Sequence, residues 1–434
     1  MPVPLSVEDK ALIERVAKDA VRNLEKCYQP GFGVFPTGDP NDVFYNMLWS
    51  RDFSHAGGYF AVGNINALLD SLNTIFSFQK KDGSLPYRVE KKRFILEYFL
   101  RVLFGIDPGA LRKIGIDFVT RRKKRPIYEG ERGNNAEDTI PSVISSIGEF
   151  FMASKERREF AENNYEKIRL AIENFIKRID PEDGLESSGV NNPDWADSIK
   201  RGGKKLSTVN IRWEIALERA EKISAELGMG EAKKYDALAK KARKGIMDKL
   251  YNEKDHYFRT GEGEERMDAV ASILGCLHIL PVEESVRVQE SMRKRLSCKS
   301  GLRNFYPPYP KKRLSFILRI IGMGGYHNEA VWPWVAAVNI HAKIKIAQEH
   351  PDKEVREQYR NESVRDLLNL AALFESAGGA YEVFDPDRPE QYRKLRTGIM
   401  KYQVPKNFMG NLASYQSVYH RLKKLGWISS DISK

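Results

Sequence analysis

The sequence has little cysteine and no long apolar run. Its three cysteines (Cys27, Cys276 and Cys298) are too few for a disulfide framework, which favours a reducing compartment. The first residues, MPVPLSVEDK, lack the apolar stretch of a secretory signal. No run approaches the roughly 20 apolar residues that a membrane-spanning helix needs. We therefore expect a soluble protein of the cytoplasm.

The chain also lacks the motifs of several ligand-binding classes. It contains neither a phosphate-binding loop nor a dinucleotide fingerprint. Its seven histidines are scattered, and no Cys/His spacing matches a zinc site, so we expect no metal and no cofactor. Wholesale disorder is excluded as well, because 41% of the residues are hydrophobic and 11% are aromatic.

The sequence is rich in helical periodicity. Ser6 and Asp9 form a capping pattern, and the apolar stripe that follows predicts a first helix (Ala11, Leu12, Val16, Ala20 and Leu24). The same kind of spacing predicts eleven more helices, at residues 52–62, 65–79, 139–153, 163–178, 207–227, 231–250, 266–280, 283–297, 327–348, 353–376 and 408–425. Strand-like alternation is scarce, and no tandem repeat indicates a solenoid.

Twelve helices can form six hairpins that close into an (α/α)6 barrel. We therefore predict an all-α chain that forms a single catalytic domain over residues 1–434. The loops that remain are long, and loops of such length are uncommon unless they are functional. They run over residues 28–51, 80–138, 180–206, 251–265, 298–326 and 377–407. We expect them to gather at one end of the barrel and to carry the site.

One loop contains Trp49-Ser50-Arg51-Asp52 directly before a helix. The adjacent Arg51 and Asp52 could hold two neighbouring hydroxyls of a sugar, and Trp49 offers a ring face for stacking. The alternative is a surface ion pair beside a buried tryptophan. A second loop motif, Gln79 to Pro86, contains Asp82-Gly83, which on its own is an ordinary turn signal.

A third loop places two carboxylates, Asp194 and Asp197, on either side of Trp195. An acid packed against an aromatic ring is desolvated, which raises its pKa and can keep it protonated as a general acid. The alternative is an aspartate that caps a helix in an ordinary loop. Either carboxylate is therefore a candidate acid.

Two further motifs combine polar groups with aromatic rings. Tyr326-His327-Asn328-Glu329 leads to Trp332 at a predicted helix start, a combination that suits polyhydroxylated ligands. His327 can be catalytic, although a histidine within an aromatic cluster is more often structural or orients substrate. The other motif is Tyr381 to Pro386, where the carboxylate of Glu382 follows two glycines; a solvent-exposed glutamate is the alternative.

These motifs are more informative together than singly. Two carboxylates on separate loops of one barrel, among Trp, Tyr, Arg and Asn, fit glycoside hydrolysis. An inverting mechanism needs an acid on one side of the glycosidic bond and a carboxylate on the other side to activate water. A carbohydrate is thus the expected substrate.

The motifs resemble those of the (α/α)6-barrel glycoside hydrolases: the α-glucosidase domain of glycogen debranching enzymes, alkaline/neutral invertases, processing α-glucosidases and mannosylglycerate hydrolases. Trp49 to Asp52 resembles the W-x-R-D of this group, and Gln79 to Pro86 resembles its Q-x-x-D-G-x-x-P turn. Tyr326 to Pro333 is similar to its Y-H-N-G-x-x-W-P. The resemblance covers most of residues 45–425, apart from a basic insert.

The resemblance implies roles for individual residues. Asp197 lies twelve residues before Val209-Asn210, as the general acid of the group does, with Asp194 as the fallback. Glu382 matches the general base in an E-x-[YF]-x-[PD] segment. The sugar subsite would be lined by Arg51, Asp52, His327, Asn328 and Glu329, with Trp49, Trp195 and Trp332 as its walls. Glu329 departs from the group, which often has glycine there, and adds a carboxylate that could contact the substrate.

The implied activity is an inverting, exo-acting α-glycosidase that cleaves an α-glucoside or an α-mannoside. One alternative is a catalytically silent carbohydrate-binding or scaffold protein on the same barrel, although both expected carboxylates are present. Another is a hydrolase of lipid-linked or acidic glycosides, such as glucosylglycerate or mannosylglycerate. The sequence does not indicate an oligomeric state.

Basic residues are concentrated in one insert. Residues 88–125 contain twelve Lys and Arg against four acids, and so contribute +8 of the net charge of +12. A second basic stretch, Lys311-Lys312-Arg313, precedes the apolar run 314–325. Basic residues beside an apolar run are typical of segments that lie on an anionic membrane. One hypothesis is that both stretches lie on the same face beside the pocket mouth and dock the enzyme to a membrane or a lipid-linked glycan.

Three other uses of these stretches remain open. The apolar residues can pack on the barrel or on a second subunit and leave the basic residues in solvent. The charge can attract an acidic soluble substrate. Nucleic acid is an unlikely partner, because the aromatic residues of 88–125 alternate with Ile, Leu and Val in the manner of a buried helix rather than a base-stacking surface.

Overall fold

The computed structural model of the chain describes residues 5–39, 45–90, 124–129, 136–153, 157–187, 194–201, 204–316, 319, 325–388 and 404–428. Residues 91–123, which make up most of the basic insert, lie outside the described residues, as does most of 317–324. All twelve predicted helices lie within the described part of the chain.

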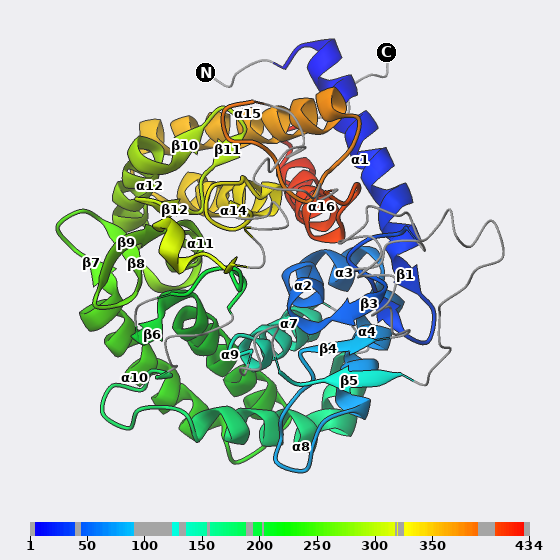
Figure 1. The fold of residues 1–434 in the computed structure, drawn as a ribbon, viewed down its shortest axis with the longest axis vertical. Helices are drawn as coiled ribbons and strands as arrows, with labels where there is room; N and C mark the ends of the chain where they lie inside the picture. Colours follow the sequence, from blue (N-terminus) through cyan, green and yellow to red (C-terminus); the bar gives the residue numbers. More distant parts are fainter. Residues whose placement is uncertain are drawn as a thin grey trace.

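An inner ring of helices surrounds the centre of the molecule (Figure 1). Neighbours along the ring are in contact, and the last helix meets the first two, which closes the ring. In chain order the inner helices are α2 (Ser50–His55), α3 (Gly57–Gly63), α7 (Thr139–Ala153), α9 (Ser207–Glu226), α11 (Ala269–Leu274), α14 (Pro333–Glu349) and α16 (Met409–Lys424).

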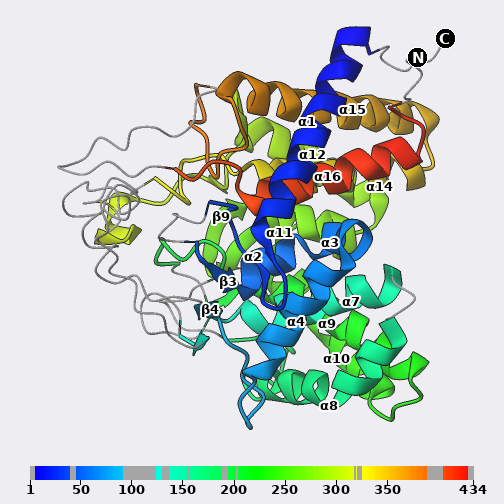
Figure 2. The same ribbon diagram turned by 90° about the vertical axis from the view of Figure 1, so that its right-hand side faces the viewer.

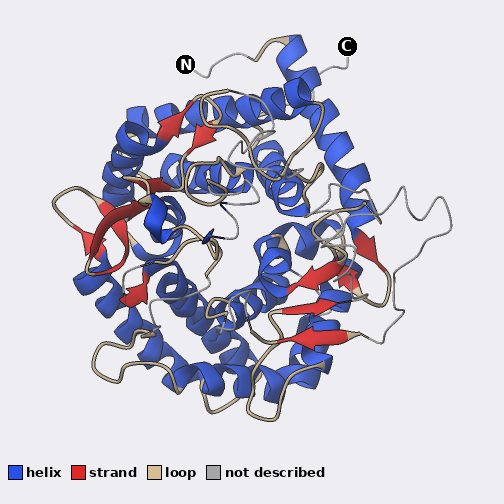
Figure 3. Cartoon of the chain, viewed as in Figure 1, coloured by secondary structure: helices blue, strands red, loops and turns tan. Residues whose placement is uncertain are grey.

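A second set of helices lies outside this ring (Figures 1 and 3). These are α1 (Val7–Cys27), α4 (Ile65–Ser77), α8 (Arg157–Ile176), α10 (Ala232–Leu250), α12 (Val282–Leu296) and α15 (Lys353–Ala377). Within the described residues the chain alternates between the two rings. Each of the six outer helices is followed by one inner helix, except that α2 and α3 together occupy one inner position. This is the (α/α)6 barrel that the helix count predicted.

Local sequence explains where several of these helices begin and end. Ser6 and Asp9 form the predicted capping box of α1, in which the Ser6 hydroxyl accepts from the Asp9 backbone N–H at 3.0 Å. Helix α15 ends at Gly378, whose φ of 73° is the left-handed conformation that glycine adopts without strain. The inner α9 is buried around most of its surface, whereas the outer α10 buries one stripe, as their places in two concentric rings require.

Four predicted helices differ from the observed ones. The helix expected at 163–178 begins six residues earlier, as α8 (Arg157–Ile176). The helix expected at 52–62 is two helices that meet at Ala56. The helix expected at 266–280 begins only at Ala269, because Glu264–Asp268 pairs as a strand, and it continues as a π-helix over Gly275–Ile279. The helix expected at 327–348 begins at Pro333, which is suited to a first turn because it lacks a backbone N–H.

Short strands lie in the loops, where the sequence showed little alternation. One antiparallel sheet joins β3 (Met47–Trp49), β4 (Arg88–Glu90) and β5 (Arg125–Ile127). A larger one has the order β12 (Phe305–Tyr306), β9 (Glu264–Asp268), β8 (Tyr257–Glu262) and β6 (Lys204–Leu206), with β7 (Tyr251–Asn252) paired to β8. Two hairpins join β1 (Tyr28–Gln29) to β2 (Gly33–Val34) and β10 (Ser297–Cys298) to β11 (Gly301–Leu302).

The strands mark the loop-bearing end of the barrel. Strands β3, β6 and β9 lead directly into the inner helices α2, α9 and α11. Figure 2 shows β3, β4 and β9 together on one side of the helices. The inner helices α2, α9 and α11 therefore begin at this end, where the loops with the candidate site residues also lie.

Candidate active site

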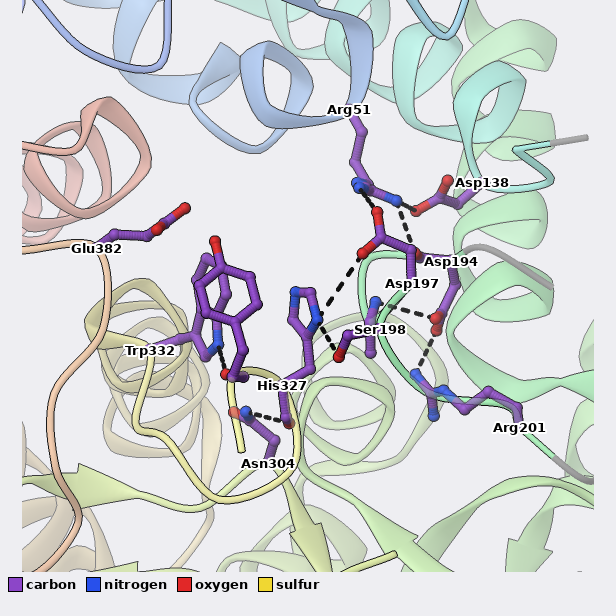
Figure 4. A network of polar contacts seen from close by, with 12 residues as sticks. Arg51, Asp138, Asp194, Asp197, Ser198, Arg201, Asn304, His327, Trp332 and Glu382 are labelled. Carbon is purple, nitrogen blue, oxygen red and sulfur yellow. Dashed lines mark hydrogen bonds and ion pairs between the residues drawn. The ribbon is translucent and has the colours of Figure 1, made fainter. Parts of the chain in front are cut away.

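Four segments bring the candidate residues together at the loop-bearing end (Figure 4). Arg51 lies in the first turn of α2. Asp197 belongs to a turn that precedes β6, and His327 to a turn that precedes α14. Glu382 follows α15. Arg51 is thus held by a helix of the barrel, and the other three by loops that the barrel positions.

Asp197 is held by three neighbours. Its Oδ2 accepts from Arg51 Nη2 and from the Tyr87 hydroxyl, both at 3.0 Å, and its Oδ1 lies 3.8 Å from His327 Nδ1. Burial alone would raise the pKa of Asp197, but the positive charge of Arg51 and the hydrogen bonds from Arg51 and Tyr87 hold it below its usual value. In the free protein Asp197 is therefore a carboxylate.

The carboxylate of the neighbouring Asp194 is used by contacts within the protein. It is completely buried, pairs with Arg201, and accepts from the Thr208 hydroxyl at 2.6 Å and from the Ala196 N–H at 3.0 Å. Arg201 also pairs with Asp268 at 2.8 Å. This network fastens the segment that carries Asp197. Asp194 consequently has a positioning role, and Asp197 is the one of the two that can reach a ligand.

A row of side chains links Glu382 to Asp197. The Tyr45 hydroxyl donates to the Glu382 carboxylate and lies 3.0 Å from the Tyr326 hydroxyl. The Tyr326 ring packs edge-on against His327 with 4.6 Å between the ring centroids, and His327 faces Asp197. Figure 4 shows Glu382 and Asp197 on opposite sides of His327 and Trp332.

Aromatic packing fixes the orientation of His327. Its ring stacks on Trp332 at 5.0 Å and 4°, and Trp195 packs edge-on against it. Its Nδ1 lies 2.8 Å from the Ser198 hydroxyl. Burial lowers the pKa of His327 to about 4, so the imidazole is neutral at neutral pH. A neutral ring fixed in this way is suited to orienting a substrate rather than to transferring a proton.

The tryptophans of the predicted subsite occupy different positions. Trp49 is half-buried, packs edge-on against Tyr87 at 5.1 Å, and has the Arg88 guanidinium 4.9 Å from its ring centre. Trp332 is in contact with His327. Trp195 is only 4% exposed and lies behind His327 and Trp332, where it supports them.

Two more aspartates approach Arg51. Burial raises the pKa of Asp52 to about 6, against the charge of Arg51, and the nearby Asp197 and Asp138 raise it further. Asp138 lies 3.6 Å from Arg51 Nη1, and burial likewise raises its pKa to about 6. Asp197 and Asp138 thus lie directly against the Arg51 guanidinium, and burial makes Asp52 and Asp138 weaker acids than usual. Asp138 was not predicted, because it stands alone at the end of a long loop without a motif.

Asn328 and Glu329 do not meet Asp197. The Asn328 carboxamide accepts from the Tyr309 N–H at 2.7 Å and donates to the Tyr309 carbonyl at 3.0 Å. Both of its polar atoms are thereby used on a neighbouring loop. The side chain of Glu329 is exposed. The structure therefore indicates that Asn328 fastens a loop instead of lining the subsite.

The turn at Gln79 to Pro86 does not contact Asp197 itself but positions the residue that follows it. Gly83 has a φ of 91°, and a Cβ there would lie 2.0 Å from the Leu170 carbonyl oxygen of α8. The turn thus packs against the outer ring, away from Asp197. It leads directly to Tyr87, which contacts Asp197, and the tyrosine after the turn motif is the signal that could have identified this residue.

The arrangement suits acid–base chemistry on a neutral polyol. Within the described residues, no group of three or more His, Cys, Asp or Glu side chains could hold a metal ion. Among the carboxyl groups of the site, Asp197 and Asp52 are partly exposed and Glu382 is fully buried, and aromatic rings border all three. Two separated carboxylates of this kind can protonate a leaving oxygen and activate a water molecule.

Comparison with known proteins gives a family and a fold. A sequence model described as amylo-alpha-1,6-glucosidase matches residues 126–394, which is more than half of the chain. No curated protein matches the sequence significantly. Three solved structures are similar over nearly the whole barrel, with TM-scores of 0.61 or 0.62, although their sequence identity is low.

The first is a wild-type glycosidase, at 12% identity, covering 98% of this chain and 100% of the other (TM-score 0.62). A Klebsiella oxytoca rhamnosidase with rhamnose bound is 13% identical over 98% of this chain and 66% of the other (0.61). A GH63 mannosylglycerate hydrolase from Thermus thermophilus, in complex with glucose, is 14% identical over 94% and 100% (0.61).

Proposed function

We propose that this chain, which belongs to the amylo-alpha-1,6-glucosidase family and is a glycoside hydrolase, cleaves a terminal α-glucoside or α-mannoside with inversion of configuration. Asp197 acts as the general acid and Glu382 as the general base. The observation that carries this proposal is the row of contacts from Glu382 through Tyr45, Tyr326 and His327 to Asp197.

In this mechanism Asp197 gives its proton to the glycosidic oxygen. The free protein favours the Asp197 carboxylate, so the proton must be taken up when substrate binds. The Asp197 side chain is 19% exposed, and a bound glycoside would remove this remaining water. Desolvation raises the pKa of a carboxyl group, and a hydrogen bond to the glycosidic oxygen requires the protonated form.

Glu382 takes the proton from a water molecule. That water attacks the anomeric carbon from the face opposite to the leaving group, while the bond between the anomeric carbon and the glycosidic oxygen breaks. Inverting enzymes separate the two carboxyl groups by ~6.5–9.5 Å to leave space for the water. The products are the free aglycone and a sugar of inverted anomeric configuration.

The remaining groups are assigned to sugar binding. Asp52 is half-buried and makes no side-chain hydrogen bond to another described residue, so its carboxyl is available to hydroxyl groups. His327 and Trp332 form a flat, stacked wall, and Trp49 forms the rim. Glu329 is exposed, and we assign it to the outer part of the subsite, where an aglycone would leave the pocket.

The proposal places the enzyme in the cytoplasm and includes attachment to the periphery of a membrane. Among the described helices, none has the length and apolarity to cross a bilayer. The basic stretches at 88–125 and 311–325 would instead hold the enzyme against an anionic surface, where it could reach a lipid-linked or acidic glycoside. Glucosylglycerate and mannosylglycerate are the soluble acidic alternatives.

The proposal is tested by a substrate screen with stereochemical readout. Trehalose, sucrose, maltose, isomaltose, glucosylglycerate and mannosylglycerate are incubated with the enzyme, and sugar release is measured against Asp197→Asn. Proton NMR of the first product then gives the anomer, which for an α-glycoside should be β. Release of the α-anomer from sucrose, glucosylglycerate or mannosylglycerate, whose leaving groups are not aldoses, would refute inversion. Sugar binding without turnover would favour a silent carbohydrate-binding protein.

A further inference from the structure

The loop from Tyr306 to Phe316, here called the docking loop, exposes apolar rings to solvent. Phe316 is 70% exposed and Tyr306 is 45% exposed. The only other large hydrophobic side chains exposed to a comparable degree among the described residues are Val7 and Met229, each alone on a different part of the surface. Two exposed rings within eleven residues form a local apolar feature, whereas isolated exposed residues are ordinary.

The same loop carries two lysines that have no ion-pair partner among the described residues. They are Lys311 and Lys312, and both are exposed. Arg313 differs, because its Nη1 lies 2.9 Å from Glu264 and its charge is thereby compensated. Within the described residues the uncompensated charge of the loop is thus positive, and it lies between the two exposed rings along the chain. Aromatic rings beside free lysines are typical of surfaces that contact an anionic lipid interface.

The docking loop is firmly seated on the barrel at its middle. Tyr309 is buried, with the Arg266 guanidinium 4.1 Å from its ring centre, and the Asn328 carboxamide bonds to both its N–H and its carbonyl. The loop can therefore present its exposed side chains in a fixed geometry, and Asn328 connects it to the segment that carries His327.

A second attachment of the docking loop to the barrel lies beside Asp197, the candidate acid. Leu314 pairs with Ile199, the Lys200 N–H donates to the Arg313 carbonyl at 2.7 Å, and the Ser315 N–H donates to the Ser198 carbonyl at 2.9 Å. Ser198 follows Asp197 directly, and its hydroxyl lies 2.8 Å from His327 Nδ1. The docking loop is therefore bonded to the residues next to both Asp197 and His327, so its surface borders the site.

We propose that the docking loop is the part of this protein that contacts an anionic lipid membrane, with Phe316 and Tyr306 in the interface and Lys311 and Lys312 at the headgroups. This deepens the peripheral attachment within the proposed function and rests on it, but it does not depend on which bond is cleaved. Because the loop is seated beside Asp197, a docked enzyme holds its site next to the membrane surface.

Vesicle binding tests the proposal with the full chain. Co-sedimentation is measured with vesicles of phosphatidylcholine alone and with 30% phosphatidylglycerol, at low and high salt, for the wild type and for Lys311→Gln/Lys312→Gln/Phe316→Ser. Two lysines near an anionic surface change the partition coefficient about 30-fold. We expect the wild type to bind only anionic vesicles at low salt, and the triple variant to bind at least ~30-fold more weakly.

A matched control removes the same chemistry elsewhere. Met229 lies at the turn after α9, at the opposite end of that helix from the site, and Lys233 and Lys244 lie on α10. The variant Met229→Ser/Lys233→Gln/Lys244→Gln should bind as the wild type does. Equal weakening in both variants would mean that overall charge alone is responsible and would overturn the proposal.

The depth of residue 316 provides a separate readout. In Phe316→Trp, a lipid brominated near the headgroup should quench the new tryptophan, whereas Met229→Trp should remain unquenched. Vesicle binding without quenching at 316 would assign the contact to another surface and overturn the proposal, as would absence of binding. Sugar release from a soluble glycoside, measured on the same variants, is expected to be unchanged, so failed docking and failed hydrolysis are distinguishable.

Discussion

The guanidinium of Arg51 lies 3.0 Å from the carboxylate of Asp197, in a buried position where desolvation alone would favour the neutral acid. The charge of Arg51 opposes desolvation and, with the Tyr87 hydroxyl, holds the pKa of Asp197 below its usual value. A general acid with a lowered pKa is protonated in only a small fraction of free enzyme molecules at neutral pH. The value of kcat/KM should therefore be highest at acidic pH.

This relationship predicts the effect of Tyr87→Phe. The variant loses a hydrogen bond that favours the ionised form, so the pKa of Asp197 should rise. Since kcat/KM reports the free enzyme, the alkaline limb of its pH profile should move up by about one pH unit. Tyr128→Phe is the control, because the Tyr128 hydroxyl bonds to the Phe78 carbonyl and not to Asp197. An unmoved or lowered limb in Tyr87→Phe would contradict the assignment.

Removal of either proposed catalytic carboxylate should abolish turnover. Asp197→Asn cannot protonate the leaving oxygen, and Glu382→Gln cannot accept a proton from water. General acid–base steps contribute ~10²–10⁴-fold, so kcat should fall by at least ~100-fold in each variant. Circular dichroism should show an intact fold. Residual activity near that of the wild type would show that the carboxylate is not part of the mechanism.

Asp194→Asn should behave differently from Asp197→Asn. Asp194 is buried and pairs with the buried Arg201, so the variant leaves a cation with less compensation in the interior. Breaking such a pair typically costs ~3–5 kcal/mol, although Asp268 remains as a second partner of Arg201 and reduces the loss. Urea unfolding should show a clear loss for Asp194→Asn and a smaller one for Asp197→Asn, because the Asp197 side chain is 19% exposed and its partner Arg51 keeps Asp138 nearby. Equal stability of the two would contradict the positioning role of Asp194.

The sequence predicted the barrel well because helical periodicity is local. Capping by Ser6 and the apolar stripes of the outer helices depend on residues three and four apart, which are visible in one dimension. The short strands were missed because each is two to six residues long and is formed by partners from distant loops, as β12 and β9 illustrate. Their pairing depends on tertiary packing more than on local alternation.

The candidate site was only partly predictable for the same reason. Arg51 and His327 were found through motifs, and the structure brings them to Asp197. Motifs do not reveal which polar atoms are already occupied. Asn328 reads as a ligand-binding residue, yet its carboxamide is used on Tyr309. Asp138 has no motif and joins Arg51 only through the fold.

The occupied carboxamide predicts the effect of Asn328→Ala. The variant leaves the buried N–H and carbonyl of Tyr309 without their partners, and an unsatisfied buried polar group costs about 1–3 kcal/mol. We expect a lower free energy of unfolding and faster proteolysis within residues 306–313. KM for the soluble substrate should change much less than in Asp52→Asn. A large rise in KM without loss of stability would instead indicate direct contact with the sugar.

Asp138 predicts how stability depends on pH. Burial raises its pKa from an unfolded value near 3.8 to about 6, so the folded protein binds the proton more tightly than the unfolded chain does. The stabilisation from this group is then complete below pH 3.8 and is lost as the pH rises to about 6. A shift of about two pH units corresponds to roughly 3 kcal/mol, since one unit is 1.36 kcal/mol.

Asp138→Asn should remove this dependence, because asparagine has the shape of the protonated acid and cannot ionise. The variant should match the wild type near pH 4 and exceed its free energy of unfolding by up to roughly 3 kcal/mol at pH 8, in urea titrations followed by circular dichroism. Burial also raises the pKa of Asp52, so the free energy of unfolding should still depend partly on pH in both proteins. Asp248→Asn, at an exposed position on α10, is the control and should follow the wild type throughout. Destabilisation of Asp138→Asn at pH 8 would mean that the attraction of the Asp138 carboxylate to Arg51 outweighs the cost of burying it, so that folding does not raise its pKa.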